Sequence, residues 1–338
     1  MPTILCAMPE RTYRRMMNPE REAELRALGE VVLCPRAHEL SEEEYGALWE
    51  RADAALTGWG VRAPTPAMLD RAPRLRIISH TAGSVRMFPR YTLEKGIVLT
   101  SARAAIARTV AEFCLMNTLI LLRRYLVFVD ADPARKAFYA RENGAAAAPL
   151  SETLYGKTVG LIGFGHIGRL FRRLLAPFGC RVIVYDPFLS GEDAAREEVE
   201  RAGDLPALLR ESKIVSLHAP DIPQTRGMIG AAELALLPDG AIFLNSARGR
   251  LVDTEALTSA LQTGRFFAAI DVTEPEPLPP DHPLRGLPNV LFTPHVAGPT
   301  DDDLPEMTRM ALTDLRRFLD GEPPLYPISL DAYDIMSF

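Results

Sequence analysis

Cysteine is scarce in this chain of 338 residues, and its four copies stand far apart, as Cys6, Cys34, Cys114 and Cys180. They form neither a Cys-x-x-Cys pair nor a spacing typical of zinc sites, which excludes the common structural metal motifs. Scattered thiols suit a reducing compartment better than a disulfide framework. We therefore expect a cytoplasmic protein without a metal centre.

The chain has no surplus of basic residues. Lysine and arginine total 38 against 44 aspartates and glutamates, which gives a formal net charge of −6. Proteins that bind nucleic acid usually carry a basic balance or a basic patch. We therefore expect neither DNA nor RNA as a partner.

Long uninterrupted apolar runs are also missing. The N-terminal run is only a few residues long and charges follow it, which predicts a short strand rather than a signal peptide. The longest apolar stretch, residues 113–129, is interrupted by Asn117, Arg123 and Arg124. A membrane span needs about 20 predominantly apolar residues. We therefore expect a long, largely buried helix and no membrane partner.

The length is too great for one ordinary core and suits two domains. In residues 1–100, short apolar runs alternate with helical patterns, which is typical of a parallel sheet covered by helices. A helix beginning after Ser41 carries a capping-box pattern, because Glu44 follows three residues later. We predict strands at 3–8, 31–33, 54–57 and 75–79 and helices at 20–28, 41–51 and 66–71.

A second series of strands and helices begins at Lys157. We predict strands at 158–163, 181–186, 214–218, 241–245, 267–271 and 290–292, with helices between them that start near Ile167, Leu205, Ala231 and Thr254. Six strands in this alternation make one doubly wound dinucleotide domain. Long helices at 104–129 and 302–319 flank the series, the alanine-rich run 144–149 is expected as a surface arm, and the tail 321–338 is expected to return to the first domain.

The predicted fold is therefore α/β, with two Rossmann-like or flavodoxin-like domains built on parallel sheets. The cofactor domain, residues 104–300, is inserted between the two long connecting helices. The substrate domain is discontinuous and takes residues 1–103 and 301–338.

A glycine-rich turn, Gly163-Phe-Gly165-His-Ile-Gly168, follows a predicted strand and opens a helix. In a dinucleotide site the first glycine permits the tight turn, the second admits the pyrophosphate, and the third allows the helix to pack on the sheet. The N–H groups of His166 and Ile167 at the helix start would hold the phosphate charge. Asp186 at the end of the next strand would bind ribose hydroxyls and repel a 2′-phosphate, so we expect NAD as cofactor.

Ionisable residues follow four later strands, namely His218, Arg248, the segment 271–276 and His295. Hydride transfer at C2 of a hydroxy acid needs a cation for the carboxylate, a group that exchanges the hydroxyl proton near neutral pH, and a partner for that group. Arginine, histidine and a carboxylate suit these three tasks.

In these motifs the sequence resembles the D-isomer-specific 2-hydroxyacid dehydrogenases. The match lies in GFGHIG with Asp186, in VSLHAP at 215–220, in NSARGRLVD at 245–253, in DVTEPEP at 271–277 and in TPHVAG at 293–298, in the same order and spacing. The resemblance implies that Arg248 binds substrate, His295 is the acid/base and Glu276 assists it. Glutamine stands in place of Glu276 in the similar formate dehydrogenases, which disfavours that activity.

The resemblance also implies further contacts. Around the cofactor they involve Ala219, Pro220, Thr225, Ala247, Asp271 and Gly298, with His218 bordering the cofactor rather than transferring the proton. On the substrate side the family uses a loop of the first domain, here Ala82, Gly83 and Ser84, although this loop departs from the commoner family form. In the family the helix at 104–122 and the following arm cross a two-fold axis, which implies a homodimer.

Two alternatives remain. The C-terminal-binding corepressors share these motifs, so an NAD(H)-sensing binding protein with little turnover is the competing function. Three arginines, Arg11, Arg14 and Arg86, follow strands of the first domain and are candidates for holding a second anionic group of the substrate. Surface charge is the competing interpretation for them, as ordinary packing is for Trp59, which is also a candidate wall of the pocket.

Overall fold

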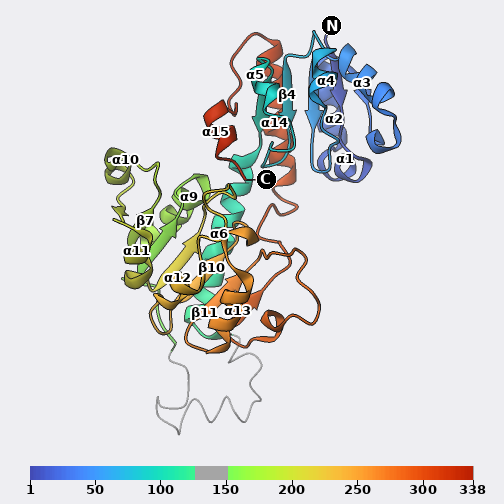
Figure 1. Cartoon of the computed structure of the whole chain (residues 1–338). Coiled ribbons are helices and arrows are strands. Elements are labelled where there is room, and N and C mark those ends of the chain that lie inside the picture. Colours follow the sequence, from blue (N-terminus) through green and yellow to red (C-terminus); the bar gives the residue numbers. More distant parts are fainter. Residues whose placement is uncertain (126–150, 338) are drawn as a thin grey trace. The chain divides into compact units, whose positions relative to one another are not determined.

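The computed structural model describes residues 1–125 and 151–337, which divide into two compact units (Figure 1). Unit 1 comprises Met1–Ile106 and Pro299–Phe338, and unit 2 comprises Ala107–Gly298. Each unit is an α/β structure on a parallel sheet, which confirms the predicted fold class. The boundaries between the two units lie a few residues from the expected domain boundaries. The alanine-rich run 144–149 lies outside the described residues.

Unit 1 is organised around a five-stranded parallel sheet with the order β2-β1-β3-β4-β5. Its strands are β1 (Thr3–Cys6), β2 (Glu30–Leu33), β3 (Ala54–Thr57), β4 (Ile77–His80) and β5 (Val98–Ser101). Its helices are α1 (Glu10–Met16), α2 (Pro19–Leu28), α3 (Glu42–Arg51), α4 (Pro66–Asp70), α5 (Tyr91–Glu94), α14 (Leu304–Leu319) and α15 (Leu330–Asp334), with a 3₁₀ turn η1 (Ala37–Glu39).

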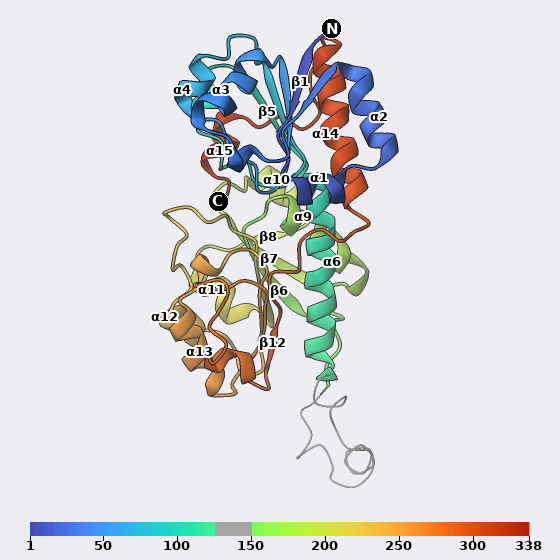
Figure 2. The same cartoon turned by 90° about the vertical axis from the view of Figure 1, so that its right-hand side faces the viewer.

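Helices cover both faces of this sheet, because successive residues of a strand point to opposite sides. In β1, Leu5 joins an apolar cluster with Tyr45 and Trp49 of α3, whereas Ile4 joins a second cluster with Met307 of α14. Figure 2 shows α2 and α14 on one side of the sheet and α3 and α4 on the other. The tail 321–338 belongs to unit 1, where the hydroxyl of Tyr333 in α15 donates to the carbonyl of Phe88 at 2.6 Å.

The predicted capping box is confirmed at the start of α3. The Glu44 N–H donates to the Ser41 hydroxyl at 3.2 Å, and the Ser41 N–H donates to the Glu44 carboxylate at 2.9 Å. Five short elements of unit 1 were not predicted, namely α1, η1, α5, β5 and α15. Helix α1 has seven residues, too few for a clear periodic pattern, and β5 is a four-residue strand at the edge of the sheet.

Unit 2 contains a seven-stranded parallel sheet with the order β12-β11-β10-β9-β6-β7-β8. Its strands are β6 (Thr158–Ile162), β7 (Arg181–Tyr185), β8 (Glu200–Arg201), β9 (Ile214–Leu217), β10 (Ile242–Asn245), β11 (Phe267–Ile270) and β12 (Val290–Phe292). Its helices are α9 (His166–Leu175), α10 (Gly191–Arg196), α11 (Leu205–Glu211), α12 (Ala231–Ala235) and α13 (Thr254–Gln262), with 3₁₀ turns η3 (Ala176–Phe178), η4 (Gly249–Leu251) and η5 (Pro283–Gly286). The prediction of six strands omitted β8, which has two residues at the sheet edge.

Helix α6 (Arg103–Leu122) spans the boundary between the units in sequence and ends earlier than predicted. Among the described helices it is the one whose length and hydropathy would also suit a membrane span. A core helix passes the same test, and the buried positions of α6, including Val110, Cys114, Asn117 and Leu121, recur at helical spacing. These residues give α6 a face that packs within the protein.

The strand order of each sheet reverses direction once, between β1 and β3 in unit 1 and between β6 and β9 in unit 2. At such a point, loops leave neighbouring strands in opposite directions and leave a crevice outside the carboxyl ends of the strands. Each sheet therefore has one place where a ligand site is expected.

Candidate active site

The glycine-rich turn lies at the reversal point of unit 2, directly after β6. Gly163 has a φ of +91°, and a Cβ atom built on it would lie 2.6 Å from the backbone nitrogen of Ala219. No side chain fits there, so the turn after β6 packs directly on the segment after β9. This contact places His218 and Ala219 beside the turn.

Gly165 differs from Gly163 in what surrounds it. A Cβ atom on Gly165 would meet nothing within 4 Å among the described residues, whereas one on Gly168 would lie 2.8 Å from the Gly163 carbonyl oxygen. Packing explains the glycine at 168 but not the one at 165. An open position at the start of α9, where the first backbone N–H groups of the helix lie, fits the close approach of a pyrophosphate.

Asp186 follows β7 and is fixed by two backbone donors. One carboxylate oxygen accepts from the Phe164 N–H at 2.7 Å, and the other accepts from the Phe188 N–H at 2.8 Å. The carboxylate thus lies at the edge of the glycine-rich turn, where the first nucleotide ribose of a bound dinucleotide is expected. No basic residue follows in the next loop, which begins with Pro187 and the exposed Phe188.

The segment after β9 is fixed by its own hydrogen bonds. Thr225 donates to the Pro220 carbonyl at 2.5 Å and accepts from the Ile222 N–H at 3.1 Å. The Nε2 atom of His218 has no hydrogen-bond partner among the described residues, and burial lowers the pKa of His218 to about 4. A histidine with this pKa is neutral at pH 7, which suits a residue that borders the cofactor better than an acid/base.

Arg248 follows β10, and the buried Asn245 fixes its backbone. The side-chain oxygen of Asn245 accepts from the Ala247 N–H at 3.1 Å, and its amide donates to the Arg248 carbonyl at 3.0 Å. Burial lowers the pKa of the Arg248 guanidinium, while the negative charges of Asp221 and Glu276 oppose this shift. An arginine remains charged in proteins, so the site holds a partly desolvated cation suited to a carboxylate.

A buried carboxylate lies close to this arginine. Asp221 is 3% exposed and pairs with Arg226 at 2.7 Å, and Arg250 approaches it at 4.0 Å. Arg250 also pairs with Glu274 at 3.1 Å. Arg250 and Glu274 are therefore engaged with structural partners, which leaves Glu276 as the available carboxylate of its segment.

The loop that carries Arg248 packs tightly on the loop after β11. A Cβ atom on Gly249 would lie 2.0 Å from the carbonyl carbon of Thr273 and 2.6 Å from the nitrogen of Glu274. Only glycine permits this approach, which brings Arg248 beside the segment that carries Glu276. Neither Gly249 nor Asn245 was among the predicted site residues, although both stand in the motif at 245–253.

His295 follows β12, and Asp271 holds its loop. The Asp271 carboxylate accepts from the Thr293 hydroxyl at 2.6 Å and from the N–H groups of Val296 and Ala297 at 2.8 and 2.9 Å. The Asp271 carbonyl accepts from the His295 N–H at 2.8 Å. These bonds hold His295 at a φ of +56°, a conformation that side chains other than glycine seldom adopt. Gly298 directly follows Val296 and Ala297, whose N–H groups donate to Asp271.

The His295 ring lies against Glu276, with Nδ1 2.5 Å from the carboxylate oxygen Oε1. Both side chains are a little less than half exposed. Because a carboxylate accepts, Nδ1 carries a hydrogen and Nε2 is left to exchange a proton with a ligand. The three predicted catalytic residues therefore gather at the carboxyl ends of the adjacent strands β10, β11 and β12.

The predicted substrate loop, which contains Ala82, Gly83 and Ser84, lies in unit 1. The carbonyls of Ala82 and Gly83 accept from the Ser101 hydroxyl at 3.0 and 2.6 Å, and the Ser84 hydroxyl donates to the Ser337 carbonyl at 2.5 Å. The loop is thus tied to β5 and to the C-terminal tail. Its role in substrate binding stays a prediction.

Two of the three candidate arginines for a second anion have protein partners instead. Arg14 pairs with Glu10 one helical turn away. Arg86 donates to the Tyr333 carbonyl at 3.3 Å, and its guanidinium lies over the Tyr333 ring, 4.6 Å from the centroid. Arg11 instead lines a pocket with Trp59. The described residues contain no group of three His, Cys, Asp or Glu side chains arranged to hold a metal ion.

The chain is similar to several known proteins. The sequence model of the D-isomer specific 2-hydroxyacid dehydrogenases, NAD binding domain, matches residues 119–297. The chain is 34% identical over 306 residues to a glyoxylate reductase of Thermococcus gammatolerans, covering 89% of this chain and 90% of that protein.

Two further proteins extend the comparison. The chain is 32% identical over 307 residues to a D-3-phosphoglycerate dehydrogenase of Methanocaldococcus jannaschii, covering 90% of this chain but only 57% of that longer relative. The crystal structure of D-lactate dehydrogenase with NAD⁺ from Lactobacillus jensenii has a TM-score of 0.76 at 25% identity, covering 97% of this chain and 99% of that one.

Proposed function

The chain belongs to the D-isomer specific 2-hydroxyacid dehydrogenase family, an NAD-dependent family of oxidoreductases, and we propose that it reduces a small 2-keto acid at C2, or oxidises the matching D-2-hydroxy acid. The observation that carries this proposal is the 2.5 Å contact between His295 and Glu276 on the strand ends next to that of Arg248. Relatives named for glyoxylate and for D-3-phosphoglycerate support a small acid as substrate.

The cofactor site fits NAD(H). The open position at Gly165 and the N–H groups at the start of α9 would bind the pyrophosphate, and Asp186 would bind the ribose hydroxyls. The cofactor, when bound, supplies or accepts the hydride at C4 of its nicotinamide. We assign supporting contacts to Ala219, Pro220, Thr225, Ala247 and Gly298, and to Asp271 through the loop it holds.

Arg248 and His295 have different roles toward the substrate: Arg248 binds its carboxylate, and His295 exchanges the proton. The Arg248 fork binds the substrate carboxylate and thereby orients C2. As the hydride reaches C2, the carbonyl oxygen gains negative charge, and Nε2 of His295 gives it a proton. Glu276 holds the ring and stabilises its positive charge before that transfer. In the oxidation direction the same Nε2 accepts the hydroxyl proton.

Turnover of NADH with a panel of 2-keto acids tests the function. The panel contains glyoxylate, hydroxypyruvate, pyruvate, phenylpyruvate, oxaloacetate and phosphonopyruvate, with NADPH in parallel. We expect rapid NADH oxidation with at least one acid and a loss of ~10²–10⁴-fold for His295→Ala with NADH binding retained. Tight NADH binding without turnover of any acid would contradict the proposal and favour the NAD(H)-sensing alternative.

We further propose that the protein is a cytoplasmic homodimer that uses α6. Phe113, Met116 and Ile120 are spaced three and four residues apart on this helix, so they share one face, and none of them is buried. Met116 is 47% exposed. An apolar stripe on a long helix is stabilised when a second copy covers it. Sedimentation of the wild type and of Met116→Lys tests this, and a wild-type monomer would refute it.

A further inference from the structure

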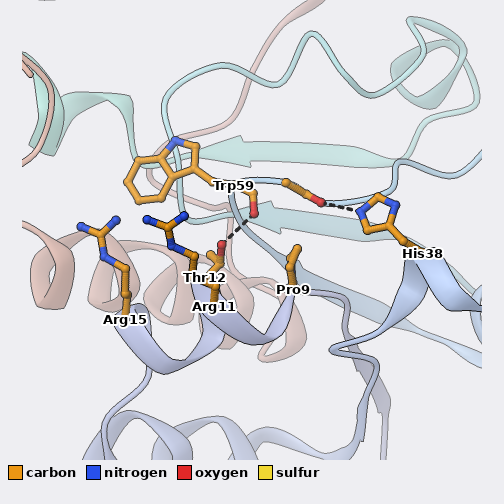
Figure 3. A pocket seen from close by; sticks show the side chains of 7 residues that line it. Pro9, Arg11, Thr12, Arg15, His38 and Trp59 are labelled. Atoms are coloured by element: carbon orange, nitrogen blue, oxygen red, sulfur yellow. Dashed lines mark hydrogen bonds between the residues drawn. The ribbon is translucent and has the colours of Figure 1, made fainter. Parts of the chain in front are cut away.

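Unit 1 contains a pocket at the reversal point of its own sheet, and none of the catalytic or cofactor residues assigned above lines it (Figure 3). The pocket has a volume of about 390 Å³, and its walls come from the segments that follow β1, β2 and β3. Its lining residues are Pro9, Arg11, Thr12, Arg15, His38, Trp59 and Gly60. The crevice between β1 and β3 is where an open α/β sheet is expected to bind a ligand.

Hydrogen bonds hold the walls of this pocket together. The Thr12 hydroxyl donates to the Trp59 carbonyl at 2.8 Å, which joins α1 to the loop after β3. Nε2 of His38 lies 3.0 Å from the Gly60 carbonyl and must donate to it, which joins the segment after β2 to the same loop. A Cβ atom on Gly58 would lie 2.9 Å from the Thr12 methyl group, so α1 packs closely on this loop. The pocket is therefore built before a ligand arrives.

The pocket carries two positive charges on one face of α1. Arg11 and Arg15 are four residues apart, and Figure 3 shows both guanidinium groups on the side of the Trp59 ring. Like charges at this spacing destabilise a helix, so an anion between them would relieve the repulsion.

The arginines on α1 differ in whether an acidic residue neutralises them. Arg14 is neutralised by Glu10. Arg15 has only a 3.5 Å contact with Asp301, whose side chain is 94% exposed, and Arg11 forms no ion pair among the described residues. The helix therefore neutralises one arginine and presents two to the pocket.

We propose that this pocket binds an oxyanion, meaning a carboxylate, sulfonate or phosphonate group, between Arg11 and Arg15, with the apolar part of the same molecule lying on Trp59. Two guanidinium groups match the oxygen geometry of such an anion, and the indole adds an apolar surface. The anion is either a second charged group of the substrate, in which case the proposal rests on the function proposed above, or a separate small anion.

The test compares Arg11→Gln/Arg15→Gln with Arg14→Gln and with the wild type. Arg14→Gln is the matched control, because it removes a positive charge from the same helix on the side paired with Glu10. In the first arm, phosphonoacetate and sulfate are titrated calorimetrically into the full-length protein. We expect binding to the wild type and to the control, and about a tenfold or greater loss of affinity in the double variant.

The second arm measures kcat/KM with NADH for oxaloacetate and phosphonopyruvate, which carry a second anion, and for glyoxylate, which does not. A loss of about tenfold or more on the first two acids alone, confined to the double variant, identifies the anion as part of the substrate. Loss of phosphonoacetate or sulfate binding without that selectivity identifies a separate anion.

Equal behaviour of the double variant and Arg14→Gln in both arms would overturn the proposal. If the wild type turns over no 2-keto acid, the proposed enzymatic function is refuted, but the proposed anion site is not. The calorimetric arm then still decides whether the pocket binds an oxyanion.

Discussion

His295 and Glu276 are 19 positions apart in the chain, and the structure places Nδ1 of the histidine 2.5 Å from Oε1 of the glutamate. The histidine reaches this position with a φ of +56°, held by the N–H bond to the Asp271 carbonyl. The pair leaves Nε2 free of Glu276 and available to a substrate.

Glu276→Gln should lower kcat for 2-keto acid reduction by roughly 10²-fold, because the neutral amide cannot stabilise the positive charge on the ring. Glu274→Gln is the matched control, since Glu274 pairs with Arg250 at 3.1 Å. Steady-state kinetics of both variants with NADH provide the measurement. Equal losses in the two variants would show that Glu276 has no special role.

Gly249→Ala should impair both stability and turnover. Its Cβ would lie 2.0 Å from the Thr273 carbonyl carbon, so the loops that carry Arg248 and Glu276 must separate. Overpacking of this kind costs about 1–3 kcal/mol in the free energy of unfolding. Gly286→Ala, whose Cβ would meet nothing within 4 Å among the described residues, is the control. A Gly249→Ala enzyme with wild-type melting temperature and kcat would contradict the packing described here.

Asp186→Ser should weaken NADH binding and narrow the preference for NADH over NADPH. The substitution removes the acceptor for the ribose hydroxyls and the charge that repels a 2′-phosphate. Fluorescence titration with both cofactors provides the dissociation constants, and the exposed Glu192→Gln of the following helix serves as control. An unchanged NADH/NADPH ratio in Asp186→Ser would place the ribose elsewhere.

His80 should make unit 1 sensitive to acid. The side chain is fully buried, Nδ1 lies 2.9 Å from the Thr57 hydroxyl, and burial lowers the pKa of His80 to about 3. An unfolded histidine takes up a proton near pH 6.5 and the folded one does not, so the unfolded state binds more protons between these values. Stability is therefore full above about pH 6.5 and falls by about 1.4 kcal/mol per pH unit as the pH drops toward 3.

Urea unfolding at several pH values between 4 and 7 measures this slope. His80→Asn should reduce it. The same slope in wild type and His80→Asn would assign the acid sensitivity to other groups.

The sequence alone determined the features that depend on near neighbours. The capping box of Ser41 and Glu44, the strand-turn-helix around Gly163–Gly168 and the ionisable residues at strand ends are all set by groups a few positions apart. The parallel order of strands also follows, because helical crossovers between short apolar runs permit little else. Arg248, Glu276 and His295 could be placed on one edge of a sheet for this reason.

Only the tertiary structure decided which side chains meet. Arg11, Arg14 and Arg86 look equivalent in sequence, yet Glu10 neutralises one, Tyr333 holds another, and Arg11 faces Trp59 across a pocket. That pocket depends on α1, a helix too short to show a period. The pair of Glu10 and Arg14 lies within one helical turn, but the contacts of Arg86 and Arg11 join segments far apart in the chain, at distances that packing sets and that no local pattern encodes.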